Sequence, residues 1–255
     1  MIRIRHPSKT GEFITVPCGR CPACLNNKRK EWVFRLKQEL RRSLTAEFVT
    51  LTYEGEKTYL SVDDVQKFLK RLRKQLKVKG LKYYLVGEYG TKTNRPHYHA
   101  LFFHERRLRN LKDMIQKTWQ KGFVHFGDVS GRSISYTTKY MLKKFLNLDK
   151  EFRPFLLCSK GLGKNYVEKK KSFHRVDPVN RGYVVDEGGV KQRMPRYYRE
   201  KLFTKFEKEL QNEKILSELY DSAANETAEI VRMKTSLQEN YRRKQNRILF
   251  EKGKI

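Results

Sequence analysis

The chain has 255 residues, of which 57 are Lys or Arg and 28 are Asp or Glu, so its formal net charge is +29. This length fits one large domain or one domain with an appendage, because a single core commonly holds ~100 to 200 residues. The charge points to a polyanionic partner, since Lys and Arg that neutralise phosphates release condensed counterions. No stretch approaches the ~20 apolar residues of a membrane-spanning helix. The opening MIRIRHPSKTGEF also lacks the apolar region of a signal peptide. We therefore expect a cytosolic protein with no membrane partner.

The first predicted elements are a helix, a strand and a second helix. Residues 25 to 44 carry apolar side chains at helical spacing among Lys and Arg, which predicts an amphipathic basic helix. Residues 48 to 53, FVTLTY, are all β-branched, aromatic or apolar and predict a buried strand. Ser61 is a predicted N-cap, with Asp64 as its capping-box partner, and Gly80 is expected to end that helix.

Two strands and two further helices follow in the pattern. Residues 81 to 90 and 97 to 103 predict strands, and the turn-rich TKTNRP between them predicts a hairpin. An amphipathic helix then stops at Gly122, and residues 123 to 129 alternate like a strand. A last helix is expected over residues 133 to 146. Strands in hairpins with helices between them predict an α+β domain, a central antiparallel β-sheet flanked by helices.

The rest of the chain carries weaker patterns. Past Cys158 the sequence is dotted with glycine and is expected to be irregular until residue 196, where a charged helical segment begins. We therefore expect a domain over residues 1–195, including a cysteine-containing N-terminal arm, and a helical extension over residues 196–255. A solvated helical hairpin packed on the domain explains that extension, and a contact with DNA or a partner is the alternative.

Two histidines and a carboxylate form the first candidate site. His97 and His99 flank one residue in RPHYH, so on a strand both imidazoles leave the same face. If the predicted hairpin closes, Glu88 on the preceding strand lies beside them. A His, His, carboxylate set with open positions suits Mg²⁺ or Mn²⁺. An H-x-H pair by itself is equally compatible with ordinary packing.

A pair of tyrosines forms the second. Tyr136 and Tyr140 lie one helical turn apart in YTTKY and share a face, and each is followed three residues later by a lysine, Lys139 and Lys143. The other side of that helix is supplied with apolar residues, Ile134, Met141, Leu142 and Phe145. Packing alone therefore explains the tyrosines poorly.

The cysteines form a third cluster. Cys18, Cys21 and Cys24 are spaced C-x-x-C-x-x-C, and Cys158 or His6 could complete a four-coordinate structural Zn²⁺ site. The alternative is three reduced cysteines in a turn before a helix, because metal sites normally pair two separate C-x-x-C units.

FVTLTY, then RPHYH, then a helix with two tyrosines and their lysines resembles, in that order, the three motifs of the HUH superfamily of rolling-circle replication initiators. The likeness is greatest to the initiators of small single-stranded DNA phages, the microviruses and in particular the gokushoviruses. PCGRCPAC before a basic helix, and SKGLG at residues 159–163, are also similar to that group. The resemblance covers about residues 16–166 and implies a ferredoxin-like or RRM-like HUH fold.

The resemblance also implies roles for individual residues. His97 and His99 match the metal-binding histidine pair, while Glu88 is assigned as third ligand from the hairpin. Tyr136 and Tyr140 match the paired nucleophiles of the two-tyrosine subclass. Lys139 matches the lysine that assists the nucleophile or the phosphate, and Lys143 would serve Tyr140 by the same spacing. Thr50 and Thr52 fall in the first motif, which is structural or contacts DNA.

The activity implied is that of a site-specific single-stranded DNA endonuclease and strand-transferase. It would nick a replication origin through a 5′-phosphotyrosine, leave a 3′-OH primer and rejoin the product, in the cytoplasm of a bacterial host cell. The chain has no G-x-x-x-x-G-K-[ST] motif, so unwinding is expected from a host helicase and extension from a host polymerase. A non-enzymatic basic nucleic-acid binder is the main alternative. An HUH relaxase or transposase is another, although relaxases usually use three histidines and those transposases one tyrosine.

Overall fold

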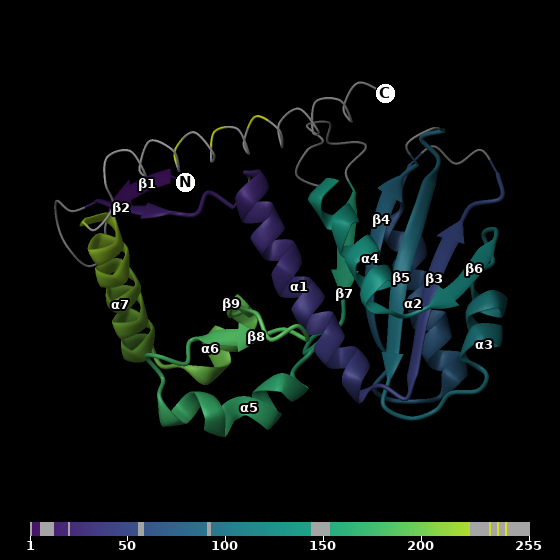
Figure 1. The fold of residues 1–255 in the computed structure, drawn as a ribbon. Coiled ribbons are helices and arrows are strands. Elements are labelled where there is room, and N and C mark those ends of the chain that lie inside the picture. The colour runs from purple at the N-terminus through teal and green to yellow at the C-terminus, as the bar shows by residue number, and fades with distance from the viewer. Residues whose placement is uncertain are drawn as a thin grey trace. The chain divides into compact units, whose positions relative to one another are not determined.

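The computed structural model describes residues 2–5, 13–19, 21–55, 59–90, 93–143 and 154–224, together with residues 235, 239 and 243. It divides into two compact units, Met1–Tyr166 and Val167–Ile255 (Figure 1). The division falls earlier than the boundary at residue 195 that the sequence suggests. No helix among the described residues is long and apolar enough to cross a membrane.

The first unit is built on a five-stranded antiparallel sheet with the order β6-β3-β5-β4-β7, which confirms the predicted α+β class. Its elements in chain order are β1 (Ile2–Arg5), β2 (Phe13–Val16), α1 (Pro22–Arg42), β3 (Thr45–Thr52), α2 (Val62–Leu76), β4 (Lys82–Tyr89), β5 (Pro96–His104), α3 (Leu111–Thr118), β6 (Val124–Asp128), α4 (Gly131–Lys143) and β7 (Phe155–Cys158). The strands β1 and β2 pair with each other in a separate small sheet.

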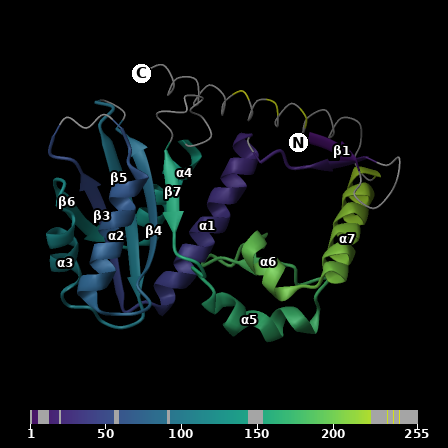
Figure 2. The same ribbon diagram turned by 180° about the vertical axis from the view of Figure 1, so that it is seen from behind.

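Helices cover both faces of the central sheet. Figure 2 shows α2 in front of the strands and Figure 1 shows α4 on the opposite side. The α2 and α3 face is closed by a large apolar cluster whose sheet residues include Leu51, Tyr98 and Phe102. A second cluster, with Leu36 of α1 and Ile134 of α4, packs on the other face. The alternation of side chains along each strand therefore supplies two separate cores.

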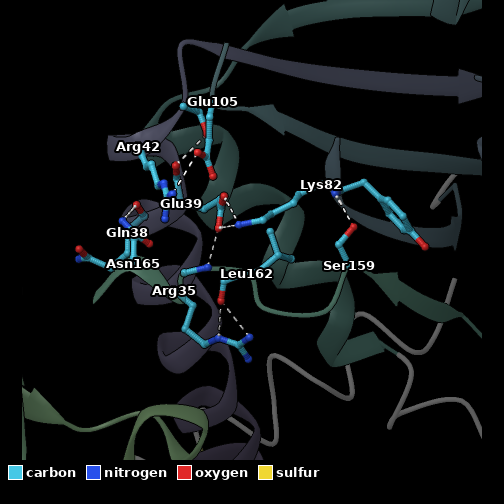
Figure 3. Close-up of polar contacts among 12 residues, drawn as sticks. Arg35, Gln38, Glu39, Arg42, Lys82, Glu105, Ser159, Leu162 and Asn165 are labelled. Carbon is cyan, nitrogen blue, oxygen red and sulfur yellow. Dashed lines mark hydrogen bonds and ion pairs between the residues drawn. The ribbon is translucent and has the colours of Figure 1, made fainter. Parts of the chain in front are cut away.

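The segment after β7 is fastened to α1 by a buried polar network. Glu39 of α1 is almost fully buried and accepts hydrogen bonds from Lys82 Nζ at 2.8 Å and from the Gly163 backbone N–H at 2.7 Å. Figure 3 shows Lys82 and Glu39 pointing toward one another, with Arg35 donating to the Leu162 carbonyl. Gly163 has φ +73°, a conformation that favours glycine, so the SKGLG sequence is explained in part by this turn.

Three local predictions are corrected by the structure. The helix α2 begins after the expected Ser61 cap, whose Oγ accepts from Asp64 N, but it ends at Leu76 rather than Gly80 because Lys77 adopts the left-handed conformation, φ 51°. The stretch expected to be irregular holds β7 and α5 (Asn165–Val176). That helix has few apolar residues to form a pattern.

Beyond residue 166 the second unit contains β8 (Tyr183–Val185), β9 (Lys191–Arg193), α6 (Arg196–Leu202) and α7 (Lys205–Ala224), and most of α5. His174 is fully buried, its Nδ1 lies 2.6 Å from the Arg181 carbonyl, and burial lowers its pKa. The helical segment expected over residues 196–252 is present to residue 224, and most of its remainder lies outside the described residues.

Candidate active site

Three potential metal ligands meet at one end of the central hairpin. The β4 and β5 register pairs Glu88 with His97, and His99 follows two residues later on the same face. His97 Nε2 lies 2.9 Å and His99 Nε2 lies 3.2 Å from Glu88 Oε1. Glu88 is only 2% exposed, and a buried carboxylate is stable only when it is paired. The hairpin predicted from the sequence therefore does bring these three side chains together.

The other ring nitrogen of each histidine has a partner of its own. His97 Nδ1 lies 3.1 Å from the Arg95 carbonyl, which can only accept, so Nδ1 donates and Nε2 is left as the metal-binding nitrogen. His99 Nδ1 lies 3.0 Å from Thr50 Oγ1 on β3. Orientation of this kind is typical of metal ligands, and two imidazoles with one carboxylate suit Mg²⁺ or Mn²⁺. The donor set present thus fits such an ion.

Both tyrosines of α4 pack against the same histidine. The Tyr140 ring stacks on His99 with centroids 4.9 Å apart, and the Tyr136 ring meets His99 edge-on at 5.4 Å. The two phenol rings contact each other at 4.8 Å. A helix turn apart in sequence, the tyrosines therefore converge on one ligand of the triad formed by Glu88, His97 and His99.

The surroundings of the two phenols differ. Tyr136 is 46% exposed, whereas Tyr140 is half-buried. The pKa of Tyr140 is raised, first by burial, then by its hydrogen bond with Tyr136 and by the negative charge of Glu88. A cation bound between Glu88 and the histidines would oppose that last effect. Lys139 is exposed on the same helix, and the side chain of Lys143 lies outside the described residues.

The position of α4 depends on residues that the sequence patterns did not single out. Thr137 and Thr138 are fully buried, and each hydroxyl donates to a carbonyl one turn earlier in the helix at 2.8 Å. Arg29 of α1 donates from Nη2 to the Ser135 carbonyl at 3.3 Å. The side chains of Met141, Leu142 and Phe145, expected to hold this helix, lie outside the described residues. Two threonines within YTTKY give no hydrophobic signal, so their burial could not be foreseen.

The cysteine cluster is only partly as expected. Cys18 Sγ and Cys24 Sγ are 3.9 Å apart, and Cys21 Sγ lies within 4.8 Å of both. Cys158 is not part of this group, because its thiol packs with the second apolar cluster. The fourth potential ligand His6 lies outside the described residues.

An antiparallel sheet that carries two histidines and a carboxylate beside a tyrosine helix defines a class of α+β protein with a candidate metal centre. Residues 46–145 match the family of the phage Replication-associated protein ORF2. The chain is 31% identical over 215 residues to Replication-associated protein ORF2 of Spiroplasma virus 4, a match over 72% of this chain and 66% of that protein. It is 32% identical to Replication-associated protein VP4 of Bdellovibrio phage phiMH2K over 76% of this chain and 69% of that protein.

A third relative is Replication-associated protein ORF4 of Chlamydia phage 1, with 26% identity over 55% of this chain and 41% of that protein. The matched part of the chain thus spans about two thirds of the length of the first two relatives. The chain belongs to this family of phage replication-associated proteins, as the motif resemblance predicts.

Proposed function

We propose that this protein is a metal-dependent endonuclease that nicks single-stranded DNA through a tyrosine and so starts rolling-circle replication. The observation that supports it most strongly is the contact of both the Tyr136 and Tyr140 rings with His99 of the triad. A protein that binds nucleic acid only through charge needs neither the convergent ligands nor the phenols beside them.

The reaction assigns a separate task to each group. The phenolic oxygen attacks the phosphorus and loses its proton, the bond from phosphorus to the 3′-oxygen breaks, and that oxygen takes up a proton to become a 3′-OH. A 5′-phosphotyrosine keeps the phosphodiester bond energy for the later joining step. His97, His99 and Glu88 would hold a Mg²⁺ or Mn²⁺ ion, which when bound would polarise the scissile phosphate. Lys139, and Lys143 by its spacing, would stabilise the negative charge of the phenolate and phosphate.

Two adjacent tyrosines make a complete cycle possible. While one phenol carries the parental 5′ end, the other cuts the regenerated origin, and the freed 3′-OH attacks the first phosphotyrosine to close the circle. Because both rings already contact His99, only a small shift of α4 or of the DNA exchanges their roles. Origin DNA, a host helicase and a host polymerase are the partners that this cycle needs, in the cytoplasm of the bacterial host.

The experiment uses single-stranded oligonucleotides of randomised sequence labelled at the 3′ end, because the downstream fragment stays attached to the tyrosine. They are incubated with the full chain and Mn²⁺ or Mg²⁺ and resolved on a denaturing gel. A labelled protein band that disappears with chelator is expected, and sequencing the captured DNA yields the site. Tight binding without any such band would instead favour the non-enzymatic binder.

A further inference from the structure

The sheet face that carries the triad continues onto β6. The register of the strands aligns one residue from each in a row across the sheet. That row consists of Val86, His99, Thr50 and His125. In the neighbouring row Thr52 pairs with His97 and donates its backbone N–H to the Phe123 carbonyl at 3.0 Å. Side chains paired across adjacent strands leave the same face, so Phe123 and His125 share the face of the metal ligands.

Neighbouring contacts agree with this assignment. Val124 and Phe126, the alternate residues of β6, pack against the apolar cluster under α2 and α3. Gly127 faces the other way, since a Cβ there would lie 3.1 Å from the Phe48 ring. The Phe48 ring in turn stacks on His99 with centroids 5.8 Å apart.

Phe123 and His125 are exposed although they lie on a sheet face that helices cover elsewhere. Phe123 is 57% exposed, and His125 is also exposed. A single exposed phenylalanine needs no explanation of its own. This one lies two strands from His97, roughly 10 Å at the usual strand spacing, in a protein of net charge +29. Aromatic rings beside positive charge are how proteins hold unpaired bases.

We propose that Phe123, extended by His125, is a platform on which an unpaired base of the DNA strand stacks, a few nucleotides from the scissile phosphate. This inference rests on the proposed function, because it takes the strand to cross the triad. Thr50 and Thr52 separate the platform from the histidines and leave the intervening surface without bulky side chains.

Binding is measured by fluorescence anisotropy with labelled oligothymidylate in chelator, in the Tyr136→Phe, Tyr140→Phe background, so that no covalent step contributes. Phe123→Ala should weaken binding about 10-fold, Phe123→Trp should restore it, and His125→Ala should weaken it less. The slope of log affinity against log salt should stay unchanged, since no charge is removed. Phe206→Ala, which removes a similarly exposed ring in α7, is the matched control and should bind normally.

Equal binding by Phe123→Ala and the background protein would overturn the platform, and so would an equal loss in Phe206→Ala. The proposed function fails differently. If the chain with both tyrosines forms no adduct in Mn²⁺ while Phe123→Ala still loses binding, the nicking activity is wrong and the stacking site remains.

A separate observation concerns the three clustered cysteines. The edge of a tetrahedron with zinc to sulfur bonds of ~2.3 Å is ~3.8 Å. Cys18 Sγ and Cys24 Sγ are 3.9 Å apart, close to that edge. The Cys21 backbone N–H donates to Cys18 Sγ at 3.2 Å, and Cys21 is the N-cap of α1 with Pro22 as its first residue. Backbone donors and a helix N-terminus both favour the thiolate, which is the form that binds metal.

We infer that Cys18, Cys21 and Cys24 bind one zinc ion, with water in the fourth position, and that the ion fixes the start of α1. Cys158 takes no part, unlike the sequence prediction. Zinc content measured on the purified full chain should fall by one equivalent in Cys21→Ser and be unchanged in Cys158→Ser. Because the triad can also hold zinc, the comparison between these two variants is the readout. Equal zinc in both variants would overturn the site, and a coloured protein containing iron would replace zinc by an iron–sulfur cluster.

Discussion

The two faces of the central sheet use the same strands for different purposes. On β5, Tyr98 points into the apolar cluster under α2 and α3, where its hydroxyl lies 2.8 Å from the Tyr53 hydroxyl and accepts from the Ser61 N–H at 2.8 Å. His97 and His99, its chain neighbours, point to the opposite face and form the triad with Glu88. The middle residue of the H-Y-H sequence therefore anchors the start of α2 while the outer two present ligands. Chemistry and stability are thus separable by alternate positions of one strand.

The largest expected effect is on the site face, from removing both phenols. Tyr136→Phe combined with Tyr140→Phe should abolish the covalent adduct, since no other nucleophile is placed beside His99. Each single variant should still form adduct on a simple oligonucleotide but fail to release closed circles. If one single variant lost all adduct while the other released circles normally, the two-nucleophile cycle would be wrong and the silent tyrosine would be a packing residue.

His97→Ala should produce the next largest loss of adduct, because it removes one of the two imidazole ligands. DNA binding in chelator should be largely retained, since the positive surface is unchanged. Glu88→Gln is the milder companion and should raise the Mn²⁺ concentration needed for half-maximal adduct formation. Undiminished cleavage by His97→Ala in chelator-treated buffer would contradict the metal assignment.

The separation of the faces also explains how far sequence reasoning reaches. Alternation along residues 97 to 103 and the turn before them predict both the hairpin and the position of Glu88, because these are local in the chain. Thr50 orients His99 across a separation of 49 residues, so its role depends on the register between β3 and β5. No local pattern contains that register. The isolation of Cys158 from the other cysteines is hidden for the same reason.

On the opposite face, Phe102→Ala should destabilise the fold by about 3 to 5 kcal/mol, as expected when a large buried ring leaves a cavity. Phe102 is fully buried and its ring contacts Phe68 of α2. Chemical denaturation measures the change in the free energy of unfolding. The adduct formed per folded molecule should remain near that of the unaltered protein. A specific loss of activity at full occupancy of the folded state would show that the two faces are coupled.

The smallest and sharpest test is Tyr98→Phe, which changes one hydroxyl between the two histidines in sequence. The Tyr53 hydroxyl and the Ser61 N–H would each lose a buried partner, and an unsatisfied buried group costs about 1 to 3 kcal/mol. Asp64 still accepts from Tyr53 at 2.8 Å, so the loss should fall toward the lower end of that range. Tyr59→Phe, on an exposed ring, is the control and should change stability by less than about 0.5 kcal/mol. Adduct formation by the folded fraction should be unchanged in both variants. If Tyr98→Phe instead raised the Mn²⁺ requirement as Glu88→Gln does, Tyr98 would be positioning the ligands through the strand, and the division of labour between the faces would not hold.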